Sequence, residues 1–144
     1  MNRQMLTYNI IKYLFLFIAG GFTYFYMEIY YRGYSHVSMI ICAGLAFILC
    51  GSIPKILPRR VSFVTQMLLS CGIITLLEFI TGYVVNIRLG MHVWDYSELP
   101  FNFMGQICLF YSLLWLALSI LCILVHDIIC WLIFDEEKPS YHIL

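Results

Sequence analysis

The sequence predicts an all-α, polytopic membrane protein: a four-transmembrane-helix bundle with a short C-terminal helix that either lies at the interface or continues the fourth span. Composition is the first observation, because 62% of the 144 residues are apolar and only 11% are charged. Soluble domains are about 45–50% apolar and about 25% charged. The second observation is four apolar windows, each close to the roughly 20 residues that a helix needs to cross a bilayer. The third is that basic residues gather in the loops of one side.

The small number of charges excludes several classes of protein. Eight acidic and eight basic residues cannot cover the water-exposed surface of a soluble domain of this size, and a disordered chain is less apolar. The formal net charge of zero provides no electrostatic surface for a nucleic-acid partner. The six cysteines form no CxxC pair, and we interpret them as small packing residues rather than disulfides or zinc ligands.

The first two spans are expected at about residues 13–31 and 37–53. No A-x-A cleavage site follows the first, so we expect it to stay in the mature protein rather than be removed as a signal peptide. Pro54 and Pro58 are expected to close the second span, because proline cannot continue a helix without losing a backbone hydrogen bond.

The third span is expected at about residues 61–87 and the fourth at about 103–125. Asn102 is a natural N-cap for the fourth, since its side chain accepts a hydrogen bond from a free backbone N–H. The apolar stretch Ile128–Phe134 is too short to span, so it either continues the fourth helix or forms an interfacial helix. No linker or low-complexity segment interrupts the chain, so residues 1–144 are interpreted as a single integral membrane domain.

Basic residues in the short loops set the orientation, because cytoplasmic loops carry an excess of Lys and Arg. Most of them fall on the side of the two termini. We therefore expect both termini in the cytoplasm and the loops after the first and third spans outside. The residues on the side of the termini are Arg3, Lys12, Lys55, Arg59, Arg60 and Lys138, and those on the other side are Arg32 and Arg88.

Glu28 lies in the outer part of the first span, and Arg32 follows at i+4 on the same helical face. An ionisable group at the bilayer centre costs at least about 2.5–3.5 kcal/mol, so it needs a partner or a role. The two residues form either an interfacial ion pair that anchors the helix or half of an inward-facing polar site. The sequence does not separate these interpretations.

Glu78 lies well inside the third span. Cys71, Thr75, Gly82 and Asn86 share its helical face, so this face is small and polar while the rest of the helix is large and apolar. Small residues let a neighbouring helix approach closely, and polar residues hydrogen-bond across the contact. The face is therefore either a structural contact within the bundle or a substrate, ion or proton site.

The external loop before the fourth span adds further polar groups. Trp94 and Tyr96 are typical of the aromatic belt at the headgroup level, and Asp95 lies between them. Gln106 lies one turn after Asn102, inside the expected fourth span, where helix capping does not explain it.

The polar residues of the spans thus gather in the outer half, while the cytoplasmic half has almost no ionisable group. This asymmetry predicts a polar pocket that opens to the outside rather than a continuous pore. The candidate substrate- or ion-binding residues are Glu28, Arg32, Glu78, Asn86, Trp94, Asp95, Asn102 and Gln106.

Sequence motifs give no support for catalysis. There is no GxxxxGKS or GxxxxGKT phosphate loop and no GxSxG nucleophile motif, and the four scattered histidines form no HxxxH pair. The chain is therefore not expected to hydrolyse ATP itself, and we expect no cofactor and no metal.

The residues discussed above fall in segments that resemble a known family. The segments are MEIYYRGYSHVSMIICAGLAF, LEFITGYVVNIRLGMHVWDYSELPFNFMGQICLFYSLLW and FDEEKP, of which LEFITG, WDYS, PFN and GQICL are the most specific parts. They resemble the small bacterial membrane proteins of the putative ABC-transporter type IV (CmpB-like) family. The resemblance implies a permease component of a bacterial inner membrane, which would need a separate ATPase subunit and more helices through homo-oligomerisation.

Three functions are compatible with the sequence. The favoured one is a permease-like component for a small solute or ion, with a polar site in the outer half of the bundle. The second is a binding or regulatory subunit of a larger membrane complex, with Gly21, Gly82 and Gly105 at the contact surface. The third is a small membrane enzyme acting on a lipid or cell-wall precursor, where Glu78 and either Asp95 or His92 supply acid–base chemistry.

Overall fold

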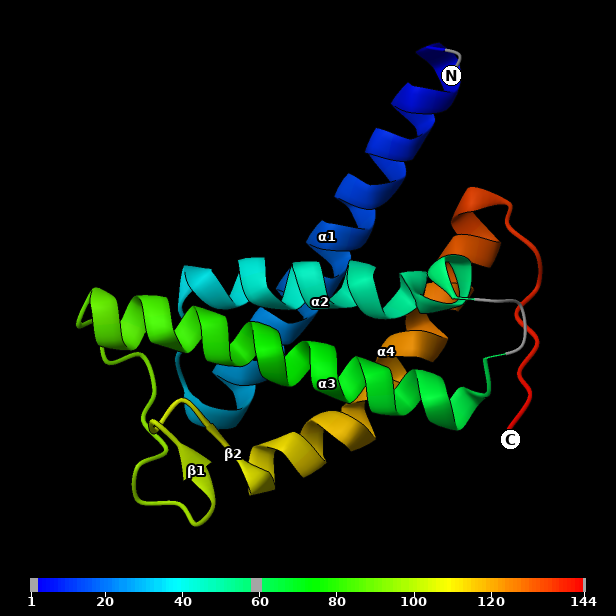
Figure 1. The fold of residues 1–144 in the computed structure, drawn as a ribbon. Coiled ribbons are helices and arrows are strands. Elements are labelled where there is room, and N and C mark those ends of the chain that lie inside the picture. Colours follow the sequence, from blue (N-terminus) through cyan, green and yellow to red (C-terminus); the bar gives the residue numbers. More distant parts are fainter. Residues whose placement is uncertain (1–2, 58–60, 144) are drawn as a thin grey trace.

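The computed structural model describes residues 3–57 and 61–143, and four long helices dominate this part of the chain (Figure 1). Each is long and apolar enough to cross a membrane, which confirms the predicted fold class. A π-helical turn continues the third helix, and two short antiparallel strands form a hairpin before the fourth. The elements are α1 (Arg3–Arg32), α2 (Val37–Ile56), α3 (Phe63–Gly82), η1 (Tyr83–Arg88), β1 (Asn102–Phe103), β2 (Ile107–Cys108) and α4 (Leu109–Phe134).

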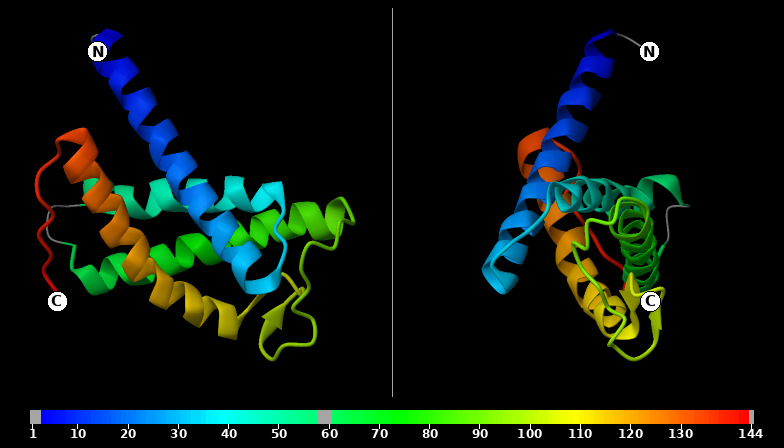
Figure 2. Two further views of the ribbon diagram at one scale, coloured as in Figure 1. Left: turned by 180° about the vertical axis from the view of Figure 1, so that it is seen from behind. Right: turned by 90° about the vertical axis from the view of Figure 1, so that its left-hand side faces the viewer.

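The helices α2 and α3 lie side by side and antiparallel, while α1 and α4 cross them at an angle (Figures 1 and 2). α1 packs chiefly against α2, whereas α3 packs against both α2 and α4. The N-terminal half of α1 projects beyond the other helices. We call the end of the bundle that carries the β1–β2 hairpin the hairpin end. The opposite end, where α1 begins and α4 ends, is the termini end.

Glycines allow α1 and α2 to approach each other closely. A Cβ atom at Gly20 would lie 2.3 Å from the Cβ of Phe47, and one at Gly21 would lie 2.6 Å from the carbonyl oxygen of Ile40. Such short separations leave no room for a larger residue. Gly21 therefore contacts this chain's own backbone instead of serving as a surface for another protein.

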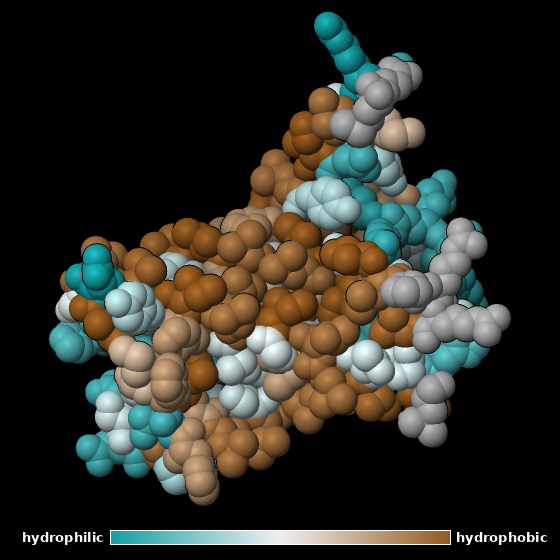
Figure 3. All heavy atoms as spheres, in the orientation of Figure 1, coloured by the Kyte–Doolittle hydropathy of each residue, from teal (hydrophilic) through white to brown (hydrophobic). Residues whose placement is uncertain are grey.

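The outward faces of the helices are apolar. Leu68, Leu76 and Leu113 are each more than half exposed. Figure 3 shows one face on which apolar residues cover the middle of the bundle and hydrophilic residues gather at its two ends. A continuous apolar surface of this kind is suited to contact with lipid rather than water. The chain is a membrane protein by helix length and by surface.

The end of α2 differs slightly from the prediction. Pro54 lies inside the helix, which continues to Ile56, because proline removes only its own backbone donor from the last turn. The second expected stop, Pro58, lies outside the described residues. So do Arg59 and Arg60, two of the basic residues that set the expected orientation.

The predicted start of the fourth helix is wrong. α4 begins at Leu109, and Asn102 belongs to strand β1 instead of capping a helix. The backbone φ angle is positive at Phe101, Met104 and Gly105. A right-handed helix requires negative φ, so these residues turn the chain into a hairpin.

The chain after α4 folds back across the termini end. α4 continues to Phe134, so the last apolar stretch extends the fourth helix and does not form a separate one. The backbone N–H of Phe63, at the start of α3, donates to the carbonyl of His142 at 2.7 Å. The Tyr141 hydroxyl donates to Oδ2 of Asp127 at 2.8 Å. These contacts tie the end of α4 to the beginning of α3.

Candidate functional site

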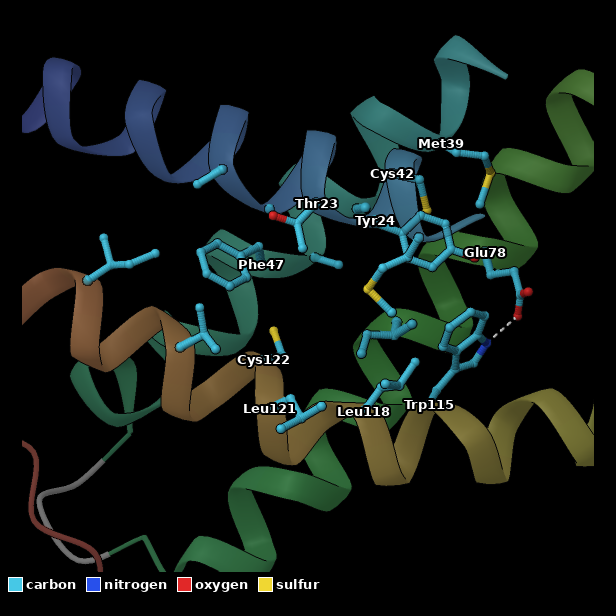
Figure 4. A pocket seen from close by; sticks show the side chains of 18 residues that line it. Thr23, Tyr24, Met39, Cys42, Phe47, Glu78, Trp115, Leu118, Leu121 and Cys122 are labelled. Atoms are coloured by element: carbon cyan, nitrogen blue, oxygen red, sulfur yellow. Dashed lines mark hydrogen bonds between the residues drawn. The ribbon is translucent and has the colours of Figure 1, made fainter. Parts of the chain in front are cut away.

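A cavity of about 300 Å³ lies between the four helices (Figure 4). Its walls are apolar apart from Thr23, Tyr24 and Glu78. In Figure 4, Tyr24, Glu78 and Trp115 gather at one end of the cavity, and Phe47 lies further along it. We call this cavity, with the residues at its Glu78 end, the Glu78 pocket.

Glu78 is the ionisable group of the pocket, and only 3% of the residue is exposed. Its Oε1 atom accepts a hydrogen bond from the Tyr96 hydroxyl at 3.0 Å, and its Oε2 atom accepts one from the indole N–H of Trp115 at 2.8 Å. Both donors are neutral. Within residues 3–57 and 61–143, no cationic side chain lies within ion-pair distance of Glu78. Because a carboxylate accepts up to about four hydrogen bonds, Glu78 keeps capacity for a further donor.

Glu28, unlike Glu78, has a cationic partner among the described residues. The Nη2 atom of Arg32 lies 2.7 Å from its Oε1 atom, so the two residues form an ion pair, as their i,i+4 spacing allows. The Ser35 hydroxyl donates to Oε2, and the Tyr24 hydroxyl lies 3.5 Å from Oε1. The ring of Tyr24 lies 5.8 Å from that of Trp115, which itself donates to Glu78. The two glutamates are therefore connected through an aromatic pair.

The small polar face of α3 packs against α4, which is the structural contact that the sequence pattern offers as one of two interpretations. The Sγ atom of Cys71 lies 3.2 Å from the carbonyl oxygen of Ser112, and the Thr75 hydroxyl lies 3.5 Å from the Ser112 hydroxyl. One turn further on, Glu78 accepts from Trp115. These hydrogen bonds hold α3 against α4 along one side of the pocket. Glu78 therefore contacts Trp115 of α4 and also lies at the cavity.

Asn86 and Gln106 build the base of the hairpin. Nδ2 of Asn86 donates to Oε1 of Gln106 at 2.8 Å, and the backbone N–H of Val93 donates to Oδ1 of Asn86 at 2.7 Å. Trp94 is 6% exposed and donates to the carbonyl of Gln106. Its assignment to the aromatic belt is therefore wrong. A Cβ atom at Gly82 would lie 2.6 Å from Oε1 of Gln106, so this glycine also contacts its own chain.

Asn102 and Asp95 shape the loop above this base. The Asn102 amide donates to the carbonyls of Ser97 and Leu99, and its oxygen accepts from the N–H of Gly105. Asp95 is exposed and accepts hydrogen bonds from the Ser97 hydroxyl and backbone N–H, which together hold the pKa of its carboxyl below the usual value. Both residues stabilise the loop that carries Tyr96.

Tyr96 reaches from this loop to Glu78. Burial, and then the neighbouring Glu78 carboxylate, raise the pKa of its hydroxyl, so it donates as a neutral group. Asp95 and His92 are exposed loop residues. In the part of the chain that the structure describes, neither shares a hydrogen bond with Glu78, so the acid–base pair considered for a membrane enzyme is not brought together.

The helices extend beyond the expected spans at the termini end, and this brings ionisable groups into the half of the bundle where the sequence predicts almost none. Lys12 lies inside α1 with 3% exposure, and its ammonium pairs with Glu136 from the chain after α4. Lys55 approaches Glu136 to 2.9 Å. His126 is 1% exposed and lies against Gly51, where a Cβ atom would be 2.1 Å from the imidazole ring. Among the described residues, no cluster of three or more His, Cys, Asp or Glu side chains is arranged to hold a metal ion.

Sequence reasoning missed Trp115 and Tyr24 as neighbours of Glu78. An aromatic residue inside an apolar span is indistinguishable by composition from a lipid-facing one. A signal was nevertheless present, because a buried indole N–H nearly always finds an acceptor. Glu78 is the acidic residue of the third span, so a pairing with Trp115 in the fourth was a testable expectation.

Comparison with known families decides the membership. The family described as "Putative ABC-transporter type IV" matches residues 6–143, nearly the whole chain. The chain belongs to this family. The match confirms the resemblance carried by the LEFITG and WDYS segments, and the four apolar helices fit the membrane protein that the family description names. No curated protein and no solved structure matches this family member significantly.

Proposed function

We propose that the chain is a permease-like component of a transporter and binds a small solute or ion in the Glu78 pocket. One observation carries the proposal: the buried Glu78 side chain lies at one end of a cavity of about 300 Å³ (Figure 4), and its carboxyl group meets only neutral donors among the described residues. A charge within a bilayer costs at least about 2.5–3.5 kcal/mol. A purely structural contact between helices does not need that charge, whereas a ligand with complementary charge offsets its cost.

The sidedness follows from charge and is part of the proposal. Basic residues favour the termini end, so both termini lie in the cytoplasm of a bacterial inner membrane and the hairpin end faces outward. In this arrangement Glu78 contacts the solute, and the Glu28–Arg32 pair lies beyond the Tyr24 ring. The remaining candidate residues position the hairpin and the loop before it, which supplies Tyr96: Asn86, Trp94, Asp95, Asn102 and Gln106.

A transport assay in membrane vesicles from the native host tests the role. Vesicles with the wild-type chain receive ATP and a defined mixture of amino acids, amines, nucleosides and inorganic ions, and mass spectrometry measures what accumulates. We expect at least one solute to accumulate, and we expect Glu78→Gln to reduce its initial rate at least tenfold. Glu98→Gln is the matched control, because it makes the same chemical change at an exposed loop position. Equal transport by Glu78→Gln contradicts the site, and no accumulation contradicts the permease role.

The proposed partner is a separate ATPase subunit, since the printed sequence has no phosphate-binding loop of its own. Purification from native membranes in mild detergent should yield a stoichiometric complex that hydrolyses ATP, alone or with further copies of this chain. Recovery of a homo-oligomer that does not hydrolyse ATP contradicts the proposed ATPase partner. In that case copies of this chain associate only with one another.

A further inference from the structure

We propose that the Glu78 pocket takes a lipophilic organic cation, a protonated or quaternary amine with an apolar body of about one aromatic ring. This inference rests on the proposed function, because it names the substrate class of the same pocket. It is carried by the shape and lining of the cavity, by the charge at one end of it, and by the surface onto which it opens.

The lining requires an apolar body. The cavity has a volume of about 300 Å³, which lies at the small end of ligand pockets. Apart from Thr23, Tyr24 and Glu78, the side chains that line it are apolar. A sugar or a hydrated inorganic ion would leave most of its polar groups without partners here, at a cost of several kcal/mol. A hydrocarbon body avoids this cost.

The Glu78 end of the pocket favours a positive charge. Glu78 is 3% exposed, and the described residues supply it with hydrogen bonds but no cation. The rings of Tyr24 and Trp115 lie 5.8 Å apart beside it, with 57° between their planes. Aromatic faces attract cations, most strongly where water is excluded. An anion would be repelled by the carboxylate, and a neutral hydrocarbon would gain nothing from it.

The pocket opens onto the lipid-facing surface between α1 and α4. Met27 on α1 is 47% exposed, and Leu121 and Val125 on α4 are 57% and 46% exposed, yet all three also line the cavity. α1 reaches α4 through aromatic contacts at two levels, Tyr24 with Trp115 and Phe15 with Phe134. A lipophilic cation concentrates in the membrane and can therefore enter from the side.

Binding of tritiated benzyltrimethylammonium to the purified, detergent-solubilised chain tests the inference. We expect saturable binding by the wild-type protein and by Glu98→Gln, and at least tenfold weaker binding by Glu78→Gln. Neopentylbenzene is the matched ligand, because it has the same shape with a carbon atom in place of the charged nitrogen. It should not compete at equal concentration. Circular dichroism and gel filtration of the Glu78→Gln variant check that it is folded.

Three outcomes overturn the inference: no binding by folded wild-type protein, equal binding by folded Glu78→Gln, or equal competition by neopentylbenzene. The last result would make the pocket an apolar lipid site. If Glu78→Gln proves unfolded, Trp115→Phe replaces it, and unchanged affinity in that variant overturns the inference. Cation binding without vesicle transport supports this inference and contradicts the permease role. Glu78-dependent transport of another solute without cation binding supports the permease role and contradicts this inference.

Discussion

The two ends of the bundle treat buried charge in opposite ways. At the termini end, Lys12 is almost fully buried and has the Glu136 carboxylate as its partner, which Lys55 shares. At the hairpin end, Glu78 is equally buried and has only the neutral donors Tyr96 and Trp115 among the described residues. Among the described residues, Lys12 has an oppositely charged partner, whereas Glu78 has hydrogen bonds only.

This difference suggests that the charges of Lys12 and Glu136 stabilise the fold, whereas Glu78 serves ligand binding. Breaking a buried ion pair by removing one partner is strongly destabilising, because it leaves an uncompensated charge. Removing a carboxylate that meets neutral donors weakens hydrogen bonds but also relieves the cost of burying its charge, so the net loss of stability is small. The termini end should therefore respond to charge removal mainly in stability, and the hairpin end mainly in ligand binding.

Glu136→Gln should have the largest effect on stability. It leaves the Lys12 ammonium without a carboxylate, and we expect a loss of about 2–3 kcal/mol, less than for a fully enclosed pair because Glu136 is 31% exposed. Unfolding in mixed detergent micelles, followed by circular dichroism, measures it. Glu137→Gln, at the neighbouring exposed position, is the control. If both variants unfold alike, the ion pair contributes no stability and the comparison fails.

Gly82→Ala should come next, with a loss of about 1–3 kcal/mol from overpacking. The new Cβ atom would lie 2.6 Å from Oε1 of Gln106 and 2.8 Å from the Trp94 ring. The expected result is a displaced hairpin, seen as a shift of tryptophan fluorescence in the same unfolding experiment. Gly72→Ala is the matched control, since nothing lies within 4 Å of a Cβ there. An unchanged fluorescence spectrum for Gly82→Ala would show that the hairpin is not packed as described.

Glu78→Gln should cost less than either, about 1 kcal/mol, because the glutamine keeps one acceptor oxygen for the two donors. The same variant is expected to lose ligand binding, so a small loss of stability accompanies a large loss of affinity. A stability loss as large as that of Glu136→Gln would mean that Glu78 is a structural charge, and the contrast between the two ends would disappear.

A pH titration of stability should give the smallest effect. Burial alone would raise the pKa of Glu136, but hydrogen bonds and charges from Lys12 and Lys55 outweigh it and hold the pKa below the ordinary value. The ion pair therefore stabilises the fold above the unfolded-state pKa, about 4.3, and this stability is lost as pH falls through the lower folded-state pKa. Glu136→Gln should lack this acid-dependent part of the unfolding curve. Identical pH dependence in both proteins would contradict the assignment.

Local signals in the sequence predict the spans and the glutamates. A charge inside an apolar window stands out by composition alone, so Glu78 and the Glu28–Arg32 pair are found without a structure. The shared face of Cys71, Thr75 and Glu78 follows from helical periodicity, and it does pack against α4.

Contacts between distant residues escape such reading. Lys12 and Glu136 are 124 positions apart, and a lysine near the start of a span looks like an interfacial residue when its partner is unknown. Asn102 carries the signal of a helix cap, yet its side chain bonds to a loop that closes on itself. The hydrogen bonds that close the hairpin override the preference of Asn102 for a helix N-cap. No periodic pattern in the sequence predicts this closure.

The unequal lengths of α1 and α2 bear on how the pocket meets the membrane. At 1.5 Å per residue, the 30 residues of α1 extend about 45 Å and the 20 residues of α2 about 30 Å. A hydrocarbon layer of about 30 Å accommodates α2 upright, and the N-terminal half of α1 projects beyond the other helices (Figure 1). The close contact at Gly20 and Gly21 fixes the angle at which α1 crosses α2. The lateral opening that α1 shares with α4 is therefore set by packing inside the bundle, and we expect it to keep its width in bilayers of different thickness.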